Sequence, residues 1–201
     1  IANNAPEWNM IDFAIQQVGA ICVPIYPTIS HDDYEHIFKH SESSIVFITN
    51  KNLYNKVADI IENTPTITDV FFIKPTEGHK SLQDLIDLGN NNIDVNRLKE
   101  VEDSVNNSDV ATIIYTSGTM GTPKGVMLTH RNIQSIIEYL CPLYPIDETH
   151  DTISYLPLSH IYERAVQYCH VYLGCSTYYV ENVGAIVDTM AEIKPHHFSS
   201  V

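Results

Sequence analysis

Residues 116–125, TSGTMGTPKG, combine four hydroxyl side chains, three glycines and one lysine, and they include no acidic side chain. They directly follow the apolar run VATIIY, which predicts a buried strand. Glycine lets backbone N–H groups approach a ligand closely, while hydroxyls and a lysine add further hydrogen-bond donors. This composition predicts a loop that binds a phosphate chain. A flexible surface turn is the alternative that the same residue types allow.

The distribution of charge along the chain favours the phosphate-binding interpretation. Between residues 116 and 132 the ionised side chains are Lys124 and Arg131, whereas residues 81–109 carry seven acidic side chains against two basic ones. The whole chain has 25 acidic and 11 basic residues, a formal charge of −14 and a pI near 4.9. An acidic chain that keeps one stretch free of carboxylates is expected to bind an anion there. The same acidity argues against a nucleic-acid partner.

The spacing of this loop excludes a Walker P-loop. That motif requires GxxxxGK followed by serine or threonine. Counted from Gly118, Pro123 stands where the second glycine belongs, and Gly125 follows Lys124 where the magnesium-binding hydroxyl belongs. The chain is therefore not expected to be a P-loop NTPase.

Short apolar runs alternate with amphipathic segments along the chain. Asn4 predicts the start of a first helix, and Ser30 with Asp33 predicts the start of a second. Apolar runs at 21–26 and 45–49 predict buried strands. This alternation predicts an α/β fold, with a mostly parallel sheet flanked by helices on both faces. Ligands of such sheets bind at the carboxyl ends of the strands.

A polar, poorly periodic stretch divides the chain. Residues 1–88 are expected to form a first α/β half, residues 89–109 a polar connection, and residues 110–201 a second α/β half that carries the loop at 115–125. The chain begins at Ile1 without a methionine and ends in an apolar run. We therefore interpret it as a fragment.

The cysteines and the hydropathy of the chain indicate where in the cell the protein is located. Cys22, Cys141, Cys169 and Cys175 show neither CxxC nor zinc-site spacing, and each lies in an apolar run. Buried thiols of this kind fit a reducing cytosol. The sequence contains no run near the roughly 18 apolar residues of a membrane span, and its first residues lack the pattern of a signal peptide. We therefore expect a cytoplasmic location.

The ordered string YTSGTMGTPKG resembles the signature loop of the adenylate-forming (ANL) superfamily of AMP-binding enzymes, whose pattern is close to YTSGTTGxPKG. The segments NNAPEW, GAICVPIYPT and GVMLTHRNI are similar to neighbouring segments of that family, so the resemblance covers most of the chain. YLPLSHIYER is similar to the version in long-chain fatty acyl-CoA synthetases of the bacterial type. The resemblance implies part of the large N-terminal domain of the acyl-CoA synthetase-like fold, without the C-terminal domain.

This resemblance implies an AMP-forming ligase. ATP and a fatty acid would give an acyl-adenylate and pyrophosphate, and coenzyme A would then displace AMP to give acyl-CoA. ATP, Mg²⁺ and coenzyme A are the implied cofactors and co-substrates, and a long-chain fatty acid is the implied substrate. Two alternatives remain open: an amino-acid or aryl-acid adenylation domain that loads a carrier protein, and a noncatalytic nucleotide-binding module. Because the segments that complete the family's nucleotide site lie beyond these residues, we expect this chain alone to be inactive.

The resemblance also implies site residues. Lys124 is expected to act as a point charge near the phosphates, and His160, at the start of a helix, to hydrogen-bond the substrate carboxylate; both are expected to be catalytic. Thr119 is expected to contact Mg²⁺ through ATP, and Met120 departs from the family pattern, which has a second threonine there. The expected nucleotide-binding residues are Tyr115, Thr116, Ser117, Gly118, Thr119, Met120, Gly121, Thr122, Lys124 and Gly125.

Other chemistry-bearing side chains receive ordinary structural interpretations. Glu163 and Arg164 are expected to pair with each other or with a segment missing from these residues, or to lie on a solvated helix face. Tyrosines in the second half invite an acyl-tunnel interpretation, but their spacing favours core packing; they are Tyr155, Tyr162, Tyr168, Tyr172, Tyr178 and Tyr179. The histidines expected to be solvated or partly packed are His31, His36, His40, His79, His150, His196 and His197. A long-chain acid as substrate adds the expectation of peripheral contact with the inner face of a membrane; the sequence predicts no oligomeric state.

Overall fold

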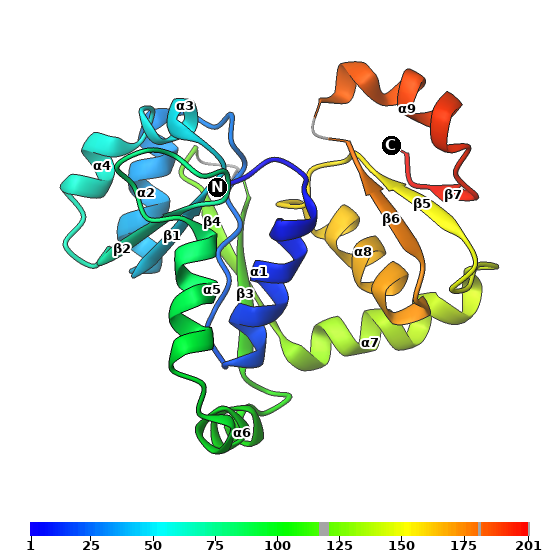
Figure 1. The fold of residues 1–201 in the computed structure, drawn as a ribbon, viewed down its shortest axis with the longest axis horizontal. Helices are drawn as coiled ribbons and strands as arrows, with labels where there is room; N and C mark the ends of the chain where they lie inside the picture. The colour runs from blue at the N-terminus through cyan, green and yellow to red at the C-terminus, as the bar shows by residue number, and fades with distance from the viewer. Residues whose placement is uncertain (117–120, 181, 201) are drawn as a thin grey trace.

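The computed structural model describes residues 1–116, 121–180 and 182–200. Within them, helices surround strands that are divided among three small sheets (Figure 1). Two of these sheets are parallel and the third is an antiparallel hairpin. The alternation of helices and strands confirms the expected α/β class.

The first sheet pairs β1 (Ile45–Ile48) with β2 (Asp69–Phe72) in parallel. The helix α2 (His31–Ser41) covers it and begins where the sequence predicts, because the Ser30 hydroxyl accepts a hydrogen bond from the Asp33 backbone N–H. Apolar side chains of the two strands and of α2 share one core. Its fully or nearly buried members include Tyr34, Ile37, Phe38, Val46, Ile48, Val57, Ile60 and Phe72. Two short helices, α3 (Lys51–Tyr54) and α4 (Ala58–Glu62), connect the strands.

The hairpin consists of β3 (Val110–Thr116) and β4 (Lys124–Thr129). The predicted phosphate loop therefore joins two antiparallel strands. The helix α7 (His130–Leu140) follows β4 directly and begins with a reciprocal capping box between Thr129 and Asn132.

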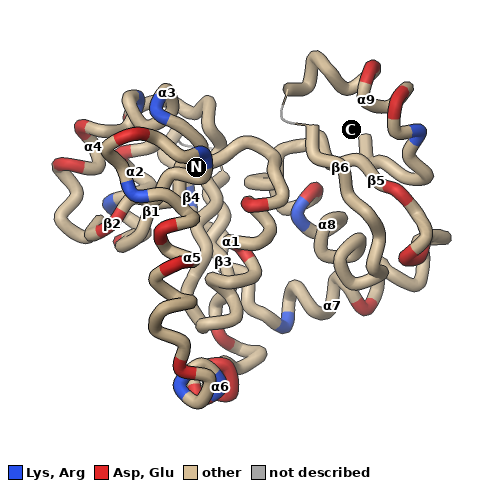
Figure 2. The backbone as a smooth tube through the Cα atoms, viewed as in Figure 1, with Lys and Arg blue, Asp and Glu red and all other residues tan. Residues whose placement is uncertain are grey.

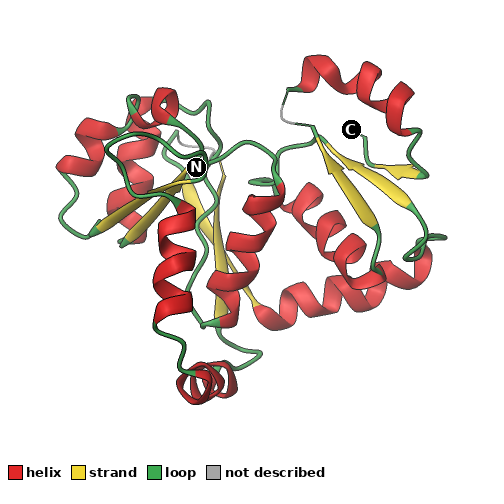
Figure 3. Ribbon diagram, in the orientation of Figure 1, coloured by secondary structure: helices red, strands yellow, loops and turns green. Residues whose placement is uncertain are grey.

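The third sheet has β5 (Asp151–Ser154) at its centre, with β6 (Ser176–Tyr179) and β7 (His197–Phe198) on either side. The helix α8 (Ile161–Leu173) connects β5 to β6, and α9 (Ile186–Ile193) leads to β7 (Figure 3). Single 3₁₀ turns follow α7 and precede α9, at Cys141–Leu143 and Val183–Ala185. In the parts of the chain that the structure describes, no helix combines the length and the apolar character that crossing a lipid bilayer requires.

The predicted polar connection at 89–109 contains a helix that the sequence analysis did not expect. The helix α5 (Leu82–Asn91) extends into this stretch, and α6 (Val95–Ser104) occupies its middle, capped by the Asp94 carboxylate. Neither helix has a buried residue. Figure 2 colours both basic and acidic residues on α6, and i,i+3 and i,i+4 ion pairs such as Lys99–Asp103 stabilise this helix, which has no buried apolar face.

Two local predictions are wrong. The helix α1 (Pro6–Gln17) has Ala5 at its N-cap, with no side-chain cap, because Asn4 is buried and bonded elsewhere. The Oδ1 of Asn4, the atom that a cap would use, accepts a hydrogen bond from the Leu158 backbone N–H instead. The amide nitrogen of Asn4 donates to the Ser154 hydroxyl and to the Leu156 carbonyl, also in the other half of the chain. Residues 21–26 are not a strand, since their pairing is limited to one bridge from Cys22; the missing N–H of Pro24 is one reason.

Candidate functional site

The mouth of the β3–β4 hairpin carries the described part of the predicted phosphate loop. Thr116 and Lys124 are cross-strand neighbours there, and Tyr115 stands opposite Gly125. Thr116, Gly121, Thr122 and Lys124 are exposed to solvent. The predicted ligands Ser117, Gly118, Thr119 and Met120 lie outside the described residues. The described side chains thus present hydroxyls and one ammonium group at the carboxyl end of β3.

Two glycines of this loop are required by its geometry. Gly121 has φ of +91°, in the region that side-chain-bearing residues rarely adopt. A Cβ at Gly125 would lie 2.7 Å from Cγ2 of Ile113 and 3.3 Å from the ring of Tyr115. Gly125 therefore lets the Tyr115 ring lie across the start of β4.

The ammonium group of Lys124 forms no ion pair with a described residue, in contrast to several other lysines. Lys39, Lys80 and Lys99 each pair with a carboxylate, whereas within the residues that the structure describes no ion pair includes Lys124. An exposed ammonium beside hydroxyl groups, with no competing carboxylate, can bind an anion through charge-assisted hydrogen bonds.

His160 occupies the N-cap of α8, as expected for a residue at a helix start. Its Nδ1 accepts a hydrogen bond from the backbone N–H of Tyr162 at 3.2 Å, and its ring is exposed. A neutral ring whose Nδ1 accepts carries its proton on Nε2, so Nε2–H is left as an outward donor. Both β3 and β5 run toward the top of Figure 1, so the hairpin mouth and the connection that ends at His160 lie on the same side of the view.

Arg164 does not lie where the sequence predicts, because it is neither paired with Glu163 nor solvated. Its side chain is fully buried, and its guanidinium forms a two-pronged ion pair with the carboxylate of Asp12 on α1. It also donates to the Thr112 hydroxyl on β3 at 2.6 Å, and it lies over the rings of Trp8 and Tyr168. This network joins α8, which begins at His160, to the strand that leads into the phosphate loop.

Glu163 is also buried, at 2% exposed, and it faces β5. Its Oε1 accepts a hydrogen bond from the Ser154 hydroxyl at 2.6 Å and another from the Gln167 amide at 3.2 Å. Burial raises the pKa of this carboxyl group to about 7, against the lowering effect of the two hydrogen bonds. The sequence shows two adjacent charged residues on a predicted helix. It gives no sign that both are buried, because charged side chains are usually exposed to solvent.

Two histidines expected to be solvated or partly packed lie at the phosphate loop. The Nδ1 atom of His40 is 2.6 Å from the phenol oxygen of Tyr115, and Nε2 of His36 is 2.9 Å from the carbonyl oxygen of Pro123. His36 is half-buried and His40 is exposed, so their burial agrees with expectation. Their position beside the loop could not be inferred from the sequence.

The tyrosines of the second half divide between core and surface. Tyr168 is buried, as the core-packing interpretation requires, and its hydroxyl donates to Asp12. Tyr162, Tyr172 and Tyr178 are exposed, so core packing is wrong for them.

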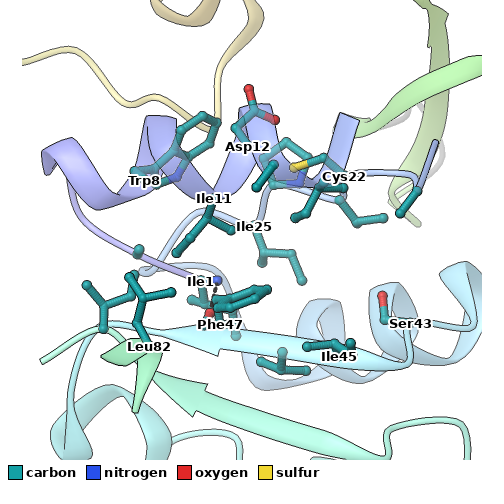
Figure 4. A pocket seen from close by; sticks show the side chains of 18 of the residues that line it. Ile1, Trp8, Ile11, Asp12, Cys22, Ile25, Ser43, Ile45, Phe47 and Leu82 are labelled. Carbon is teal, nitrogen blue, oxygen red and sulfur yellow. Dashed lines mark hydrogen bonds between the residues drawn. The ribbon is translucent and has the colours of Figure 1, made fainter. Parts of the chain in front are cut away.

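A large cavity of about 660 Å³ lies apart from the loop, between α1, residues 20–25, β1 and α5 (Figure 4). Its walls are largely aliphatic, and among the described residues that line it there is no lysine, arginine or histidine side chain. In Figure 4, Ile11 and Ile25 point toward β1, whereas the carboxylate of Asp12 points away from it. The described lining of this cavity therefore offers no cationic side chain to offset the charge of a phosphate chain.

Sequence comparison identifies relatives across the whole chain. A model of the AMP-binding enzyme family matches residues 1–201. The chain is 30% identical over 214 residues to Long chain acyl-CoA synthetase 4 of Arabidopsis thaliana, a match that covers 98% of this chain and 32% of that protein. It is 31% identical over 208 residues to Long-chain-fatty-acid--CoA ligase ACSBG2 of Homo sapiens, covering 98% and 31%. The chain thus spans about a third of the length of these curated relatives.

Solved structures share the fold. The anthranilate CoA ligase AuaEII in complex with anthranoyl-AMP superimposes with a TM-score of 0.84 at 20% identity, covering 98% of this chain and 38% of that one. A long-chain-fatty-acid-CoA ligase (FadD1) from Archaeoglobus fulgidus gives a TM-score of 0.75 at 25% identity, with the same coverage. The arrangement of helices and small sheets is therefore that of part of a known fold.

Proposed function

This chain belongs to the AMP-binding enzyme family, and from that membership we propose that the polypeptide containing it is an AMP-forming long-chain fatty acid–CoA ligase. Two relatives that match 98% of the chain are named as a long-chain acyl-CoA synthetase and a long-chain-fatty-acid–CoA ligase, which supports this substrate class. One structural observation carries the proposal. Lys124, with no ion-pair partner among the described residues, stands beside Thr116 where β3 ends.

In the proposed first half-reaction, a carboxylate oxygen of the fatty acid attacks the α-phosphorus of ATP. The bond from that phosphorus to the bridging oxygen breaks, and pyrophosphate leaves. The ammonium group of Lys124 offsets the charge on the departing phosphates, while the hydroxyls of Thr116 and Thr122 donate to phosphate oxygens. Holding the partners in line converts an unfavourable encounter of two anions into an intramolecular step.

His160 orients the acid in this proposal. Its Nε2–H donates to the carboxylate, and the N-terminus of α8 places a partial positive charge beside the same anion. In the second half-reaction, the thiol of coenzyme A loses its proton to solvent and its sulfur attacks the acyl carbon. The bond from that carbon to the AMP oxygen breaks, and AMP leaves. Acyl-CoA and AMP are then the products.

Mg²⁺ fits this site as a companion of the nucleotide. Among the described residues no group of His, Cys, Asp or Glu side chains could hold a metal ion, and the hairpin mouth offers hydroxyls and an ammonium group instead. The donor set therefore suits phosphate oxygens, which would carry the metal, and Thr119 is the proposed protein contact. When bound, Mg²⁺ would neutralise charge on the β- and γ-phosphates.

A thioester assay on the natural polypeptide that contains residues 1–201 tests the proposal. With MgATP, hexadecanoate and coenzyme A, we expect acyl-CoA formation with release of one pyrophosphate per thioester. Lys124→Ala should lower kcat/KM for ATP by roughly 10- to 100-fold, the value of one charge-assisted hydrogen bond. Lys99→Ala, which removes an exposed lysine of α6, should leave the rate unchanged.

The same assay separates the alternatives. ATP-dependent release of pyrophosphate with anthranilate or an amino acid, but not with hexadecanoate, would show that the substrate is an aryl acid or an amino acid and not a fatty acid. Binding of ATP without pyrophosphate release on any acid would mean a noncatalytic nucleotide-binding module. Unchanged kinetics in Lys124→Ala would refute the assigned role of the loop lysine.

The proposal extends to a cytoplasmic enzyme that meets its water-insoluble acid at the inner face of a membrane. The free thiols of Cys22, Cys141, Cys169 and Cys175 support a reducing compartment. Cosedimentation with anionic lipid vesicles, compared with and without hexadecanoate, tests the membrane encounter, and fractionation of cells tests the location.

A further inference from the structure

One face of α2 contacts both arms of the phosphate loop, at Tyr115 on one arm and at Pro123 on the other. His36 and His40 are one helical turn apart, so their side chains lie on the same face of the helix. Their rings stack with centroids 5.3 Å apart, and each presents its edge or face to the ring of Tyr115 at 6.2 Å and 5.7 Å respectively. The pair therefore forms one continuous surface against the hairpin mouth.

Each histidine binds a different arm of the loop. His40 hydrogen-bonds the phenol of Tyr115, which begins the first arm of the loop on β3. His36 reaches the carbonyl oxygen of Pro123, which lies in the second arm of the loop and directly precedes Lys124. Because a carbonyl oxygen only accepts, Nε2 of His36 must carry the proton in that bond.

The helix that carries both histidines is itself firmly held. The opposite face of α2 contributes Tyr34, Ile37 and Phe38 to the first core, each with 4% or less of its surface exposed. A close-packed core of this kind resists displacement. The histidines thus connect the loop arms to a rigid frame that is far from them in the sequence.

We propose that His36 and His40 are positioning residues, which hold the two arms of the phosphate loop at the separation that a nucleoside triphosphate requires. The inference rests on the proposed function and adds to it a device for preorganising the loop. Fixing both arms before the nucleotide arrives reduces the ordering that binding must otherwise supply. It also fixes the backbone from which Lys124 projects, since Pro123 is the adjacent residue.

Substitution of each histidine by asparagine or glutamine tests the contribution of its hydrogen bond separately from that of its ring volume. The amide nitrogen of glutamine reaches the place of a histidine Nε2, and that of asparagine the place of Nδ1. His36→Gln and His40→Asn therefore keep the two contacts, whereas His36→Asn and His40→Gln displace them. His31→Gln is the matched control, because His31 lies on the same helix and pairs with Asp59 rather than with the loop.

The assay uses the natural polypeptide that contains these residues, with MgATP, hexadecanoate and coenzyme A. The position-matched variants should keep KM for ATP within about twofold, and the displaced variants should raise it about three- to tenfold, the value of one hydrogen bond. KM for hexadecanoate and the melting temperature should stay at the wild-type values. A purely structural role would instead lower the melting temperature and affect both substrates together.

Tyr115→Phe provides a second route that leaves both histidines in place. Removing the phenol oxygen should raise KM for ATP as much as His40→Gln does, and the two changes combined should not add. Additive effects, or displaced variants that match the wild type, would overturn the positioning role alone. A wild-type polypeptide without ATP-dependent activity would instead overturn the proposed function, and the positioning role with it.

Discussion

The guanidinium of Arg164 on α8 and the carboxylate of Asp12 on α1 face each other across 152 residues of sequence, with Nε 3.0 Å from Oδ2. Neither side chain has more than 1% of its surface exposed. The Thr112 hydroxyl on β3 completes the site, so three elements from both halves of the chain meet at one buried charge pair. This pair links the helix of His160 to the strand of the phosphate loop.

Removing Asp12 should destabilise the fold strongly. Asp12→Ala leaves the guanidinium of Arg164 buried without a counter-ion, and we expect a loss of about 3 to 5 kcal/mol in the free energy of unfolding. Urea unfolding followed by circular dichroism measures it. Asp103→Ala, which breaks an exposed ion pair on α6, should change stability by less than about 0.5 kcal/mol. Similar losses in the two variants would contradict the importance assigned to the buried pair.

The buried carboxyl of Glu163 should give stability a pH dependence. Its pKa is about 7 in the folded protein against an ordinary value of 4.5, so the folded state binds the proton more tightly. The stability that this gives is complete below pH 4.5 and is lost as pH rises toward 7. The loss is roughly 3 kcal/mol, since one pKa unit corresponds to about 1.4 kcal/mol.

Glu163→Gln should remove that dependence. The difference in unfolding free energy between wild type and variant should therefore change between pH 4.5 and 7, and be constant outside this range. His170, whose pKa burial lowers to about 4, acts in the opposite direction, but its contribution is common to both proteins and cancels. A difference that is independent of pH would show that Glu163 ionises normally.

Glycine at position 125 should be required for the hairpin. In Gly125→Ala the new methyl group would meet Ile113 at 2.7 Å, and we expect a loss of about 1 to 3 kcal/mol from overpacking. Gly89→Ala is the control, because that glycine lies inside α5 with no atom near its Cβ. Thermal unfolding should show Gly89→Ala unchanged or more stable by up to about 1 kcal/mol, as helix propensity predicts. Equal melting temperatures for the two variants would count against the close approach at Gly125.

His160 should have two separable roles. His160→Ala removes the N-cap of α8 and should cost about 0.5 to 2 kcal/mol in stability, whereas His160→Asn keeps a good N-cap and should restore it. Neither variant offers the Nε2–H donor, so kcat for thioester formation should fall about 10- to 100-fold in both. Full recovery of the rate in His160→Asn would leave His160 with a capping role only.

Features that depend on neighbouring residues could be predicted from the sequence. The hydroxyl and glycine content of the loop, the cap formed by Ser30 and Asp33, and the helix start at His160 each involve residues a few positions apart. Such patterns express local backbone chemistry, which is the same wherever the segment lies in the fold. The family resemblance likewise rested on contiguous strings.

The tertiary structure alone decided which distant residues meet. Asn4 looks like a helix cap in the sequence, but its Oδ1 accepts a hydrogen bond from the Leu158 backbone N–H in the other half of the chain. Arginine is a residue type that is usually exposed, but Arg164 is buried because Asp12 and Thr112 lie within hydrogen-bond distance of its guanidinium. His36 and His40 acquire their place beside the loop only when α2 packs against the hairpin. These contacts follow from how elements pack, and a linear pattern carries no information about the neighbour across an interface.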